Sequence, residues 1–148
     1  MTVPTVAVGG VAVRDGEILL VRRGRGPAAG EWSVPGGRVA FGEDLRTAVV
    51  REVAEETGLD VVVVRFLGWV ERFGTEPNPH HFVILDFLVA PLDPDRAPVA
   101  GDDAVEVRWV ALDRLDELRL VEGLAEFLED VGVLGPPPPG VVRADPDR

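Results

Sequence analysis

The chain has 148 residues, a formal net charge of −11 and no cysteine. This length suits one domain, which would bury about two thirds of its unfolded surface and need no cross-links. The missing cysteines exclude disulfides, zinc–thiolate sites and thiol nucleophiles. The acidic balance argues against a nucleic-acid-binding surface, whose usual mark is a basic stripe.

The first ten residues show no sign of a targeting leader, because they contain no arginine or lysine. No uninterrupted apolar run approaches the ~20 residues that span a bilayer. We therefore expect a cytoplasmic protein that does not enter a membrane. All 15 basic residues are arginine, so the role of each must be judged from its position.

Two apolar segments, residues 3–14 and 17–22, are predicted to be adjacent antiparallel strands. Asp15 and Gly16 lie between them and are a strong signal for a tight hairpin turn. Both segments are apolar on both faces, which indicates a sheet that is covered on each side by other elements.

An arginine-rich loop follows the second strand. Arg22, Arg23 and Arg25 alternate there with glycines and a proline. The loop is either a solvated basic segment or a phosphate clamp, because guanidinium groups match the geometry of phosphate oxygens. Arg22 and Arg23 are the better candidates for substrate binding. Trp32, further along, is predicted mainly to anchor the next turn by packing.

Residues 36–59 form a glycine-rich loop that leads into one predicted amphipathic helix. Gly58 is placed to end this helix as a C-cap, and Asp44 or Glu43 stands at its start. The apolar positions recur at helical spacing and should face the core: Leu45, Ala48, Val49 and Val53.

Three carboxylates share one face of this helix. Glu52, Glu55 and Glu56 fall at positions i, i+3 and i+4, so their like charges repel. They also lie near the helix C-terminus, where the helix dipole disfavours negative charge. The face is either a solvated acidic surface paired with arginines or a site for a cation. Arg51 alone cannot neutralise these groups together with Glu43, whereas Mg²⁺ takes oxygen ligands of this kind.

The same residues resemble a known sequence signature. Gly37, Glu43, the run from Arg51 to Glu56, and Gly58-Leu59 are spaced as in the Nudix box, G-x5-E-x7-R-E-U-x-E-E-x-G-U, where U is an apolar residue. Every constrained position of that motif is satisfied, which makes the match far more specific than a lone glycine motif.

The resemblance implies hydrolysis of a nucleoside diphosphate linked to another group, with Mg²⁺ or Mn²⁺ as cofactor. It implies that Glu52 and Glu56 are the principal metal ligands, and that Glu55 is a further ligand or the group that activates water. The backbone carbonyl of Gly36 would be another ligand. Glu43 and Arg51 would pair and steady the loop against the helix.

Strands are predicted after the helix at residues 61–64, 66–70 and 80–90, with a turn-rich loop at 72–79. A hairpin of this kind can place its loop over a site. Phe73 and His81 are therefore candidates to contact a base or ribose, although an exposed histidine at a strand start commonly has no function.

A further strand is predicted at residues 105–110, after a polar connection. By the family resemblance an acidic residue here, Glu106, could act as a base near the metal; the alternative is an ion pair with Arg51 or Arg22. A broken helical pattern at 112–118 and 121–131 should cover the sheet face opposite the first helix. The expected domain is residues 1–134, followed by a proline-rich tail at 135–148.

The order of elements predicts an α/β sandwich of the Nudix type, with a mixed sheet between helical layers. The expected substrate is a small molecule linked to a nucleoside diphosphate. Residues 80–109 look like those of small prokaryotic ADP-ribose pyrophosphatases, which favours ADP-ribose or a nucleotide sugar. The alternatives are an oxidised nucleoside triphosphate and a non-catalytic nucleotide-sensing regulator. Homodimers are common in the resembled family and are possible here.

Overall fold

The computed structural model describes residues 3–26, 28–75, 79–101 and 103–135. The predicted proline-rich tail lies, except for Gly135, outside the described residues. The elements in chain order are β1 (Thr5–Arg14), β2 (Glu17–Arg23), β3 (Trp32–Ser33), β4 (Gly36–Arg38), α1 (Leu45–Thr57), β5 (Val61–Gly74), β6 (His80–Pro91), β7 (Ala104–Ala111), the 3₁₀ helix η1 (Leu112–Glu117) and α2 (Leu124–Asp130).

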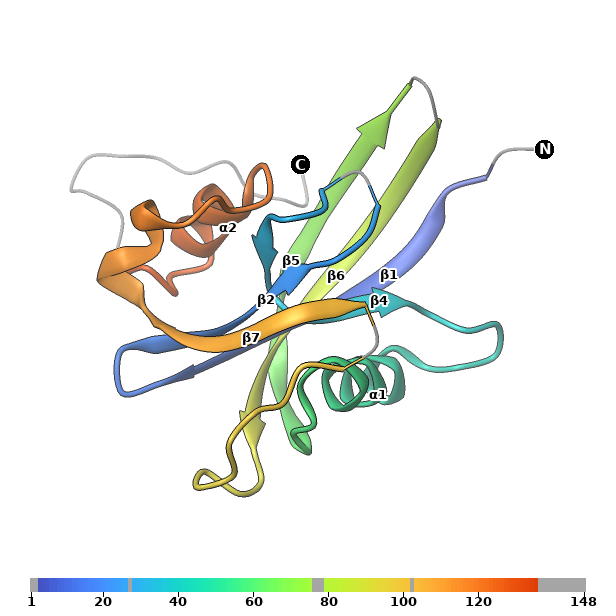
Figure 1. The fold of residues 1–148 in the computed structure, drawn as a ribbon. Coiled ribbons are helices and arrows are strands. Elements are labelled where there is room, and N and C mark those ends of the chain that lie inside the picture. The colour runs from blue at the N-terminus through green and yellow to red at the C-terminus, as the bar shows by residue number, and fades with distance from the viewer. Residues whose placement is uncertain (1–2, 27, 76–78, 102, 136–148) are drawn as a thin grey trace.

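A mixed sheet lies between two helical layers, as predicted. Helix α1 covers one face, and η1 and α2 lie on the other (Figure 1). The strand order is β3-β2-β1-β6-β5, with β4 paired to β1 and β7 paired to β2. β1 and β6 are parallel, and the neighbouring pairs β1–β2 and β6–β5 are antiparallel.

The predicted hairpin between β1 and β2 is present. Asp15 (φ 47°) and Gly16 (φ 76°) both have positive φ, as a tight hairpin turn of the I′ type requires. The two strands pair only next to the turn, at Val13–Ile18 and Arg14–Glu17. Further along, β4 takes the place beside β1, and β2 pairs instead with β7. The sequence predicted the turn but not this divergence.

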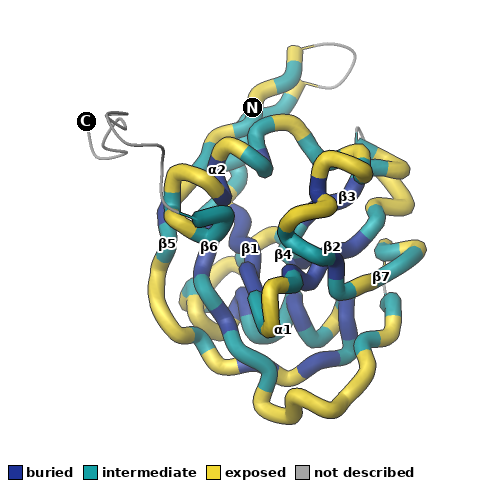
Figure 2. The backbone as a smooth tube through the Cα atoms, turned by 90° about the vertical axis from the view of Figure 1, so that its left-hand side faces the viewer, coloured by how far each residue is buried: buried dark blue, intermediate teal, exposed yellow. Residues whose placement is uncertain are grey.

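Two apolar clusters fill the space on either side of the sheet. Ala48, Val49 and Val53 of α1 pack on the sheet within the first cluster. Phe127 and Leu128 of α2 belong to the second. Figure 2 shows the buried backbone concentrated in the central strands. Burying each of these larger side chains contributes roughly 1.5–3 kcal/mol, which fixes α1 firmly against the sheet.

Helix α1 begins and ends as its sequence indicates. The Asp44 side chain accepts a hydrogen bond from the Thr47 N–H, and Gly58 ends the helix with a left-handed φ of 72°. The helical segment predicted at 112–118 and 121–131 differs from the prediction. Residues 112–117 form a 3₁₀ helix, and the α-helix begins only at Leu124. Trp32 is 4% exposed and packs in the second cluster.

Within the described ranges, no helix is both long and apolar enough to cross a membrane.

Candidate active site

Arg51 is the centre of the charged cluster on α1. Its Nε and Nη2 atoms donate to the two carboxylate oxygens of Glu43, at 2.8 and 2.9 Å. Its Nη1 atom donates to Glu52 at 2.8 Å and contacts Glu55 at 3.2 Å. Nη2 also donates to the backbone carbonyl of Arg38 at 3.1 Å. The guanidinium therefore ties the helix to both the loop before it and β4.

These contacts shift the pKa values of the pair. The hydrogen bonds from Arg51, together with one from the Ala40 N–H, lower the pKa of Glu43 to about 2. The hydrogen bonds to Glu43 raise the pKa of Arg51 above its usual range, against the effect of burial. The pairing of Glu43 with Arg51 that the resemblance implied is present, and both groups are charged at neutral pH.

Glu52 and Glu56 point toward the glycines of β4. The Gly36 N–H donates to Glu56 Oε1 at 2.7 Å. A Cβ atom at Gly37 would collide with the carboxylate of Glu52. Only a residue without a side chain leaves room for that carboxylate, so the sequence Gly36-Gly37 and the two glutamates form one structural unit.

This unit has a donor set suited to a hard divalent cation. The Arg51 guanidinium contacts three carboxylates, those of Glu43, Glu52 and Glu55. Glu56 adds a fourth carboxylate at the Gly36 N–H, so negative charge remains in excess. Among the described residues, no three acidic or histidine side chains already form a metal-binding group. Two carboxylates are nevertheless sufficient for Mg²⁺, which is usually held by one or two carboxylates together with substrate phosphates. The residues present therefore fit such an ion.

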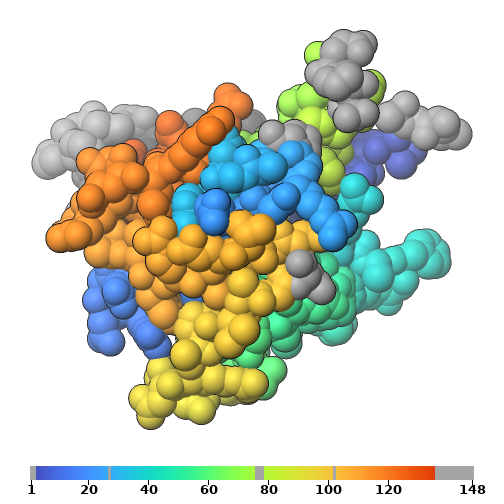
Figure 3. Space-filling view, viewed as in Figure 1, coloured from blue at the N-terminus to red at the C-terminus, as the bar shows by residue number. Residues whose placement is uncertain are grey.

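The segment before β7 lies against the end of α1. The Gly101 N–H donates to the Glu56 backbone carbonyl at 3.1 Å, and the Gly24 N–H donates to the Asp103 carbonyl at 2.8 Å. Figure 3 shows the loop after β2, the start of β7 and α1 meeting on one face of the molecule. The arginine-rich loop is thereby brought toward the carboxylate cluster. Arg25, in this loop, pairs with Asp103 at 3.1 Å.

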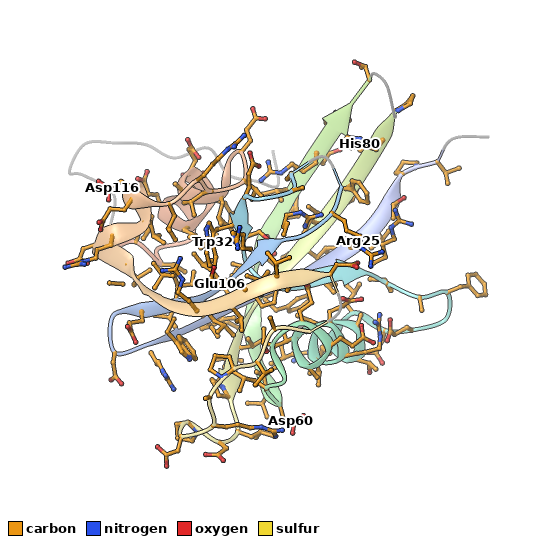
Figure 4. All side chains as sticks on the ribbon, in the orientation of Figure 1. Arg25, Trp32, Asp60, His80, Glu106 and Asp116 are labelled. Carbon is orange, nitrogen blue, oxygen red and sulfur yellow. The ribbon has the colours of Figure 1, made fainter. Side chains whose placement is uncertain are left out.

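Glu106 lies on β7 in ion pairs with two arginines. It contacts Arg22 Nε at 3.4 Å and Arg108 Nε at 2.8 Å. Figure 4 shows Glu106 near Trp32, whose ring lies under the Arg108 guanidinium. The alternative considered for Glu106, an ion pair with Arg22, is therefore what the structure contains. Its role as a base remains a prediction, as does phosphate binding by Arg22 and the exposed Arg23.

Phe73 and His81 lie together next to the loop that joins β5 to β6. Their rings stack at a centroid distance of 4.4 Å, and His81 Nε2 lies 2.8 Å from Glu71 Oε2. Figure 4 shows the neighbouring His80 toward the end of that hairpin. His81 is five residues along β6 from Asp86, which lies level with Gly9 and Gly36. At about 3.3 Å per residue this is roughly 16 Å, so the hairpin pair is not part of the carboxylate cluster.

Asp86 is a functional candidate that the sequence interpretation missed. It is only 4% exposed, and its Oδ1 atom is buried without a hydrogen-bond partner among the described residues. Burial raises the pKa of Asp86 to about 7, although the charge of Arg72 acts in the opposite direction. The available signal was a single acidic residue within the otherwise apolar run of residues 82–90.

The comparisons with known proteins agree with this geometry. The model of the NUDIX domain matches residues 3–131. An ADP-ribose pyrophosphatase of Methanocaldococcus jannaschii is 39% identical over 118 residues, which is 78% of this chain and 66% of that protein. An oxidized purine nucleoside triphosphate hydrolase of Danio rerio is 29% identical over 106 residues, or 71% of this chain and 65% of that protein.

A solved structure extends the comparison to the fold. The crystal structure of a MutT NUDIX hydrolase from Burkholderia pseudomallei superposes with a TM-score of 0.76 and 32% identity, covering 86% of this chain and 97% of that one. The chain belongs to the Nudix family. It spans just under two thirds of the length of the two curated relatives.

Proposed function

We propose that this protein is a metal-dependent pyrophosphatase that hydrolyses a nucleoside diphosphate linked to a second group. The observation that carries the proposal is the unit formed by Gly36, Gly37, Glu52 and Glu56. Two carboxylates are turned toward a backbone segment that has no side chain to block an approaching diphosphate. Family membership supports the same reaction class.

In this proposal Glu52, Glu56 and the Gly36 carbonyl hold Mg²⁺ or Mn²⁺, with Glu55 as a further ligand or as the group that accepts a proton from the attacking water. The ion would neutralise the crowded carboxylates and polarise the diphosphate. Glu55 is suited to the proton-accepting role because its side chain is 41% exposed and can reach solvent.

Arg51 and Glu43 have a positioning role in the same proposal. The two-point contact between them fixes the guanidinium, which in turn holds Glu52 on the side of β4. Such a charge-assisted fork is the most directional contact available to a carboxylate. The products are a nucleoside monophosphate and the phosphate ester of the second group.

ADP-ribose or a nucleotide sugar is the proposed substrate class. The similarity to the Methanocaldococcus jannaschii ADP-ribose pyrophosphatase, over most of this chain, supports it. The second candidate is an oxidised purine nucleoside triphosphate, which the Danio rerio relative favours. A non-catalytic nucleotide sensor is the third, but a binding domain has no need of three glutamates on one arginine and a fourth beside the glycines of β4.

A turnover panel tests these alternatives. The protein is incubated with Mg²⁺ or Mn²⁺ and with ADP-ribose, nucleotide sugars, and canonical and oxidised deoxynucleoside triphosphates, and the released phosphate products are measured. We expect highest kcat/KM on ADP-ribose or a nucleotide sugar. A preference for oxidised triphosphates would select the second candidate. Nucleotide binding without turnover of any compound would select the sensor.

The Glu56→Gln variant tests the site itself. It keeps the size of the side chain but removes its charge, so we expect kcat to fall at least 100-fold on the best substrate while the melting temperature is maintained. Glu129→Gln, on the exposed side of α2, is the matched control and should retain full activity. Near-normal turnover by Glu56→Gln would refute the assignment.

We further propose that the protein forms a homodimer through β5. The sheet order ends at this strand, and Val62, Val64 and Phe66 of β5 are each about half exposed, at 45, 52 and 45%. A long apolar edge strand is a surface that proteins normally cover. Light scattering should give twice the chain mass for the wild type and the monomer mass for Val64→Lys; a monomeric wild type would end this proposal.

A further inference from the structure

Asp86 has a buried carboxyl oxygen, Oδ1, that accepts no hydrogen bond from the residues that the structure describes. It lies in the middle of β6, between Gly9 of β1 and Gly68 of β5, which are its register neighbours on either side. Neither neighbour has a side chain that could donate a hydrogen bond. Its Oδ1 atom is buried and has no partner within the described part of the chain. An unmade hydrogen bond of this kind costs stability, typically 1–3 kcal/mol.

The direction of the carboxyl group follows from what a side chain at Gly9 would meet. A Cβ there would collide with Asp86 Oδ1 and would lie 3.2 Å from Val34 Cγ2. The carboxyl group therefore lies across Gly9 toward Val34. Val34 is followed by Pro35 and Gly36. The Gly36 N–H donates a hydrogen bond to the Glu56 carboxylate. The unpartnered oxygen thus faces the turn that carries the proposed diphosphate site.

This carboxyl group is on the sheet face opposite α1. The next residue of β1, Gly10, faces Val49 and Val53 of α1, and successive residues of a strand point to opposite faces. Val34 accordingly packs with the second apolar cluster, on the side of α2. Ile84 shares the face of Asp86 by the same alternation and, like Val34, is only partly buried. Two apolar side chains and one acceptor are thus presented beside the turn.

Arg72 adds a positive group to the same face. It lies on β5, and its charge acts on the Asp86 carboxyl group. Its guanidinium is directed at Gly123, since a Cβ at that glycine would lie 2.8 Å from Arg72 Nη1. The sheet face beside the glycine turn therefore carries both a buried acceptor, Asp86 Oδ1, and a cation, Arg72.

We propose that Asp86 is a specificity-determining residue that accepts a hydrogen bond from the nucleoside part of the substrate, with Val34 and Ile84 beside the base or ribose. The inference rests on the proposed function, because it takes the diphosphate to lie at Gly36 and Gly37. Nucleosides carry O–H donors on the ribose and N–H donors on the base. A bound donor would satisfy the oxygen that the fold leaves unsatisfied, and buried groups in such environments gather at functional sites.

Binding measurements test the inference without requiring turnover. The probes are AMP and, separately, inorganic pyrophosphate, each titrated by calorimetry into the full chain in the presence of Mg²⁺. Asp86→Asn keeps the shape of the side chain but replaces one acceptor oxygen by a donor amide. We expect this variant to bind AMP at least tenfold more weakly and to bind pyrophosphate as the wild type does. Asp60→Asn makes the same chemical change on an exposed turn and should alter neither affinity.

The outcomes separate this inference from the proposed function. Unchanged AMP binding in Asp86→Asn would overturn the inference, and so would an equal loss of AMP and pyrophosphate binding, since that indicates a merely structural role. Loss of turnover in Glu56→Gln combined with unchanged AMP binding in Asp86→Asn would leave the proposed function standing alone. AMP binding that depends on Asp86 in a protein without turnover would support the nucleoside site and refute the hydrolase.

Discussion

Replacing Asp86 by Asn should stabilise the protein at neutral and alkaline pH. Burial raises the pKa of Asp86 from 3.8 to about 7 in the folded protein. A shift of roughly three units, at about 1.4 kcal/mol per unit, corresponds to about 4 kcal/mol of native-state destabilisation when the group is ionised. Asn has a similar volume and carries no charge, so it removes this cost.

The sign of the pH dependence follows from proton binding. Between pH 4 and 7 the folded protein keeps the Asp86 proton that the unfolded chain releases, so this group lowers the free energy of unfolding as pH rises. The stability advantage of Asp86→Asn should therefore grow from roughly 2 kcal/mol at pH 5 to roughly 4 kcal/mol at pH 8. At pH 8 this corresponds to about 10 °C in melting temperature.

Urea unfolding of both proteins at pH 5 and pH 8, followed by circular dichroism, measures these differences. Asp60→Asn is the control for the general effect of removing one negative charge from an acidic chain, and it should show no comparable gain. An Asp86→Asn advantage that is equal at the two pH values would refute the reasoning, because the cost would then not come from ionisation. A variant that is more stable but binds AMP less tightly would show that the carboxyl group is kept for binding.

Two further predictions concern the carboxylate cluster. Gly37→Ala should lower kcat at least tenfold, because the new Cβ displaces the Glu52 carboxylate; steady-state kinetics measures this, and unchanged kcat would contradict the role of the glycine. The hydrogen bonds from Arg51 lower the pKa of Glu43 from 4.5 to about 2. The ionised Glu43 therefore stabilises the fold above pH 4.5, and this stabilisation is lost as the pH falls toward 2. Between pH 4.5 and pH 2 the melting temperature of Glu43→Gln should therefore fall less than that of the wild type or of Glu129→Gln. Equal falls in melting temperature in the three proteins would exclude this effect.

Local features of the chain were predictable because their causes are local. The cap at Asp44, the left-handed stop at Gly58 and the turn at Asp15-Gly16 depend on neighbouring residues only. The 3₁₀ conformation of residues 112–117 was not predicted, because an apolar pattern of that length does not distinguish it from an α-helix.

The sequence by itself determined the helix that carries the glutamates, the turns that flank it and the spacing that marks the Nudix family, because spacing along one helix already places its side chains on a common face. Only the tertiary structure decided that β2 leaves β1 for β7 and that Glu106 meets Arg22. It alone also placed Asp86 between two glycines, with its Oδ1 atom buried and unpaired among the described residues. These features depend on strand pairing between distant segments, and the register of such pairing is set by packing of the whole sheet rather than by any local pattern.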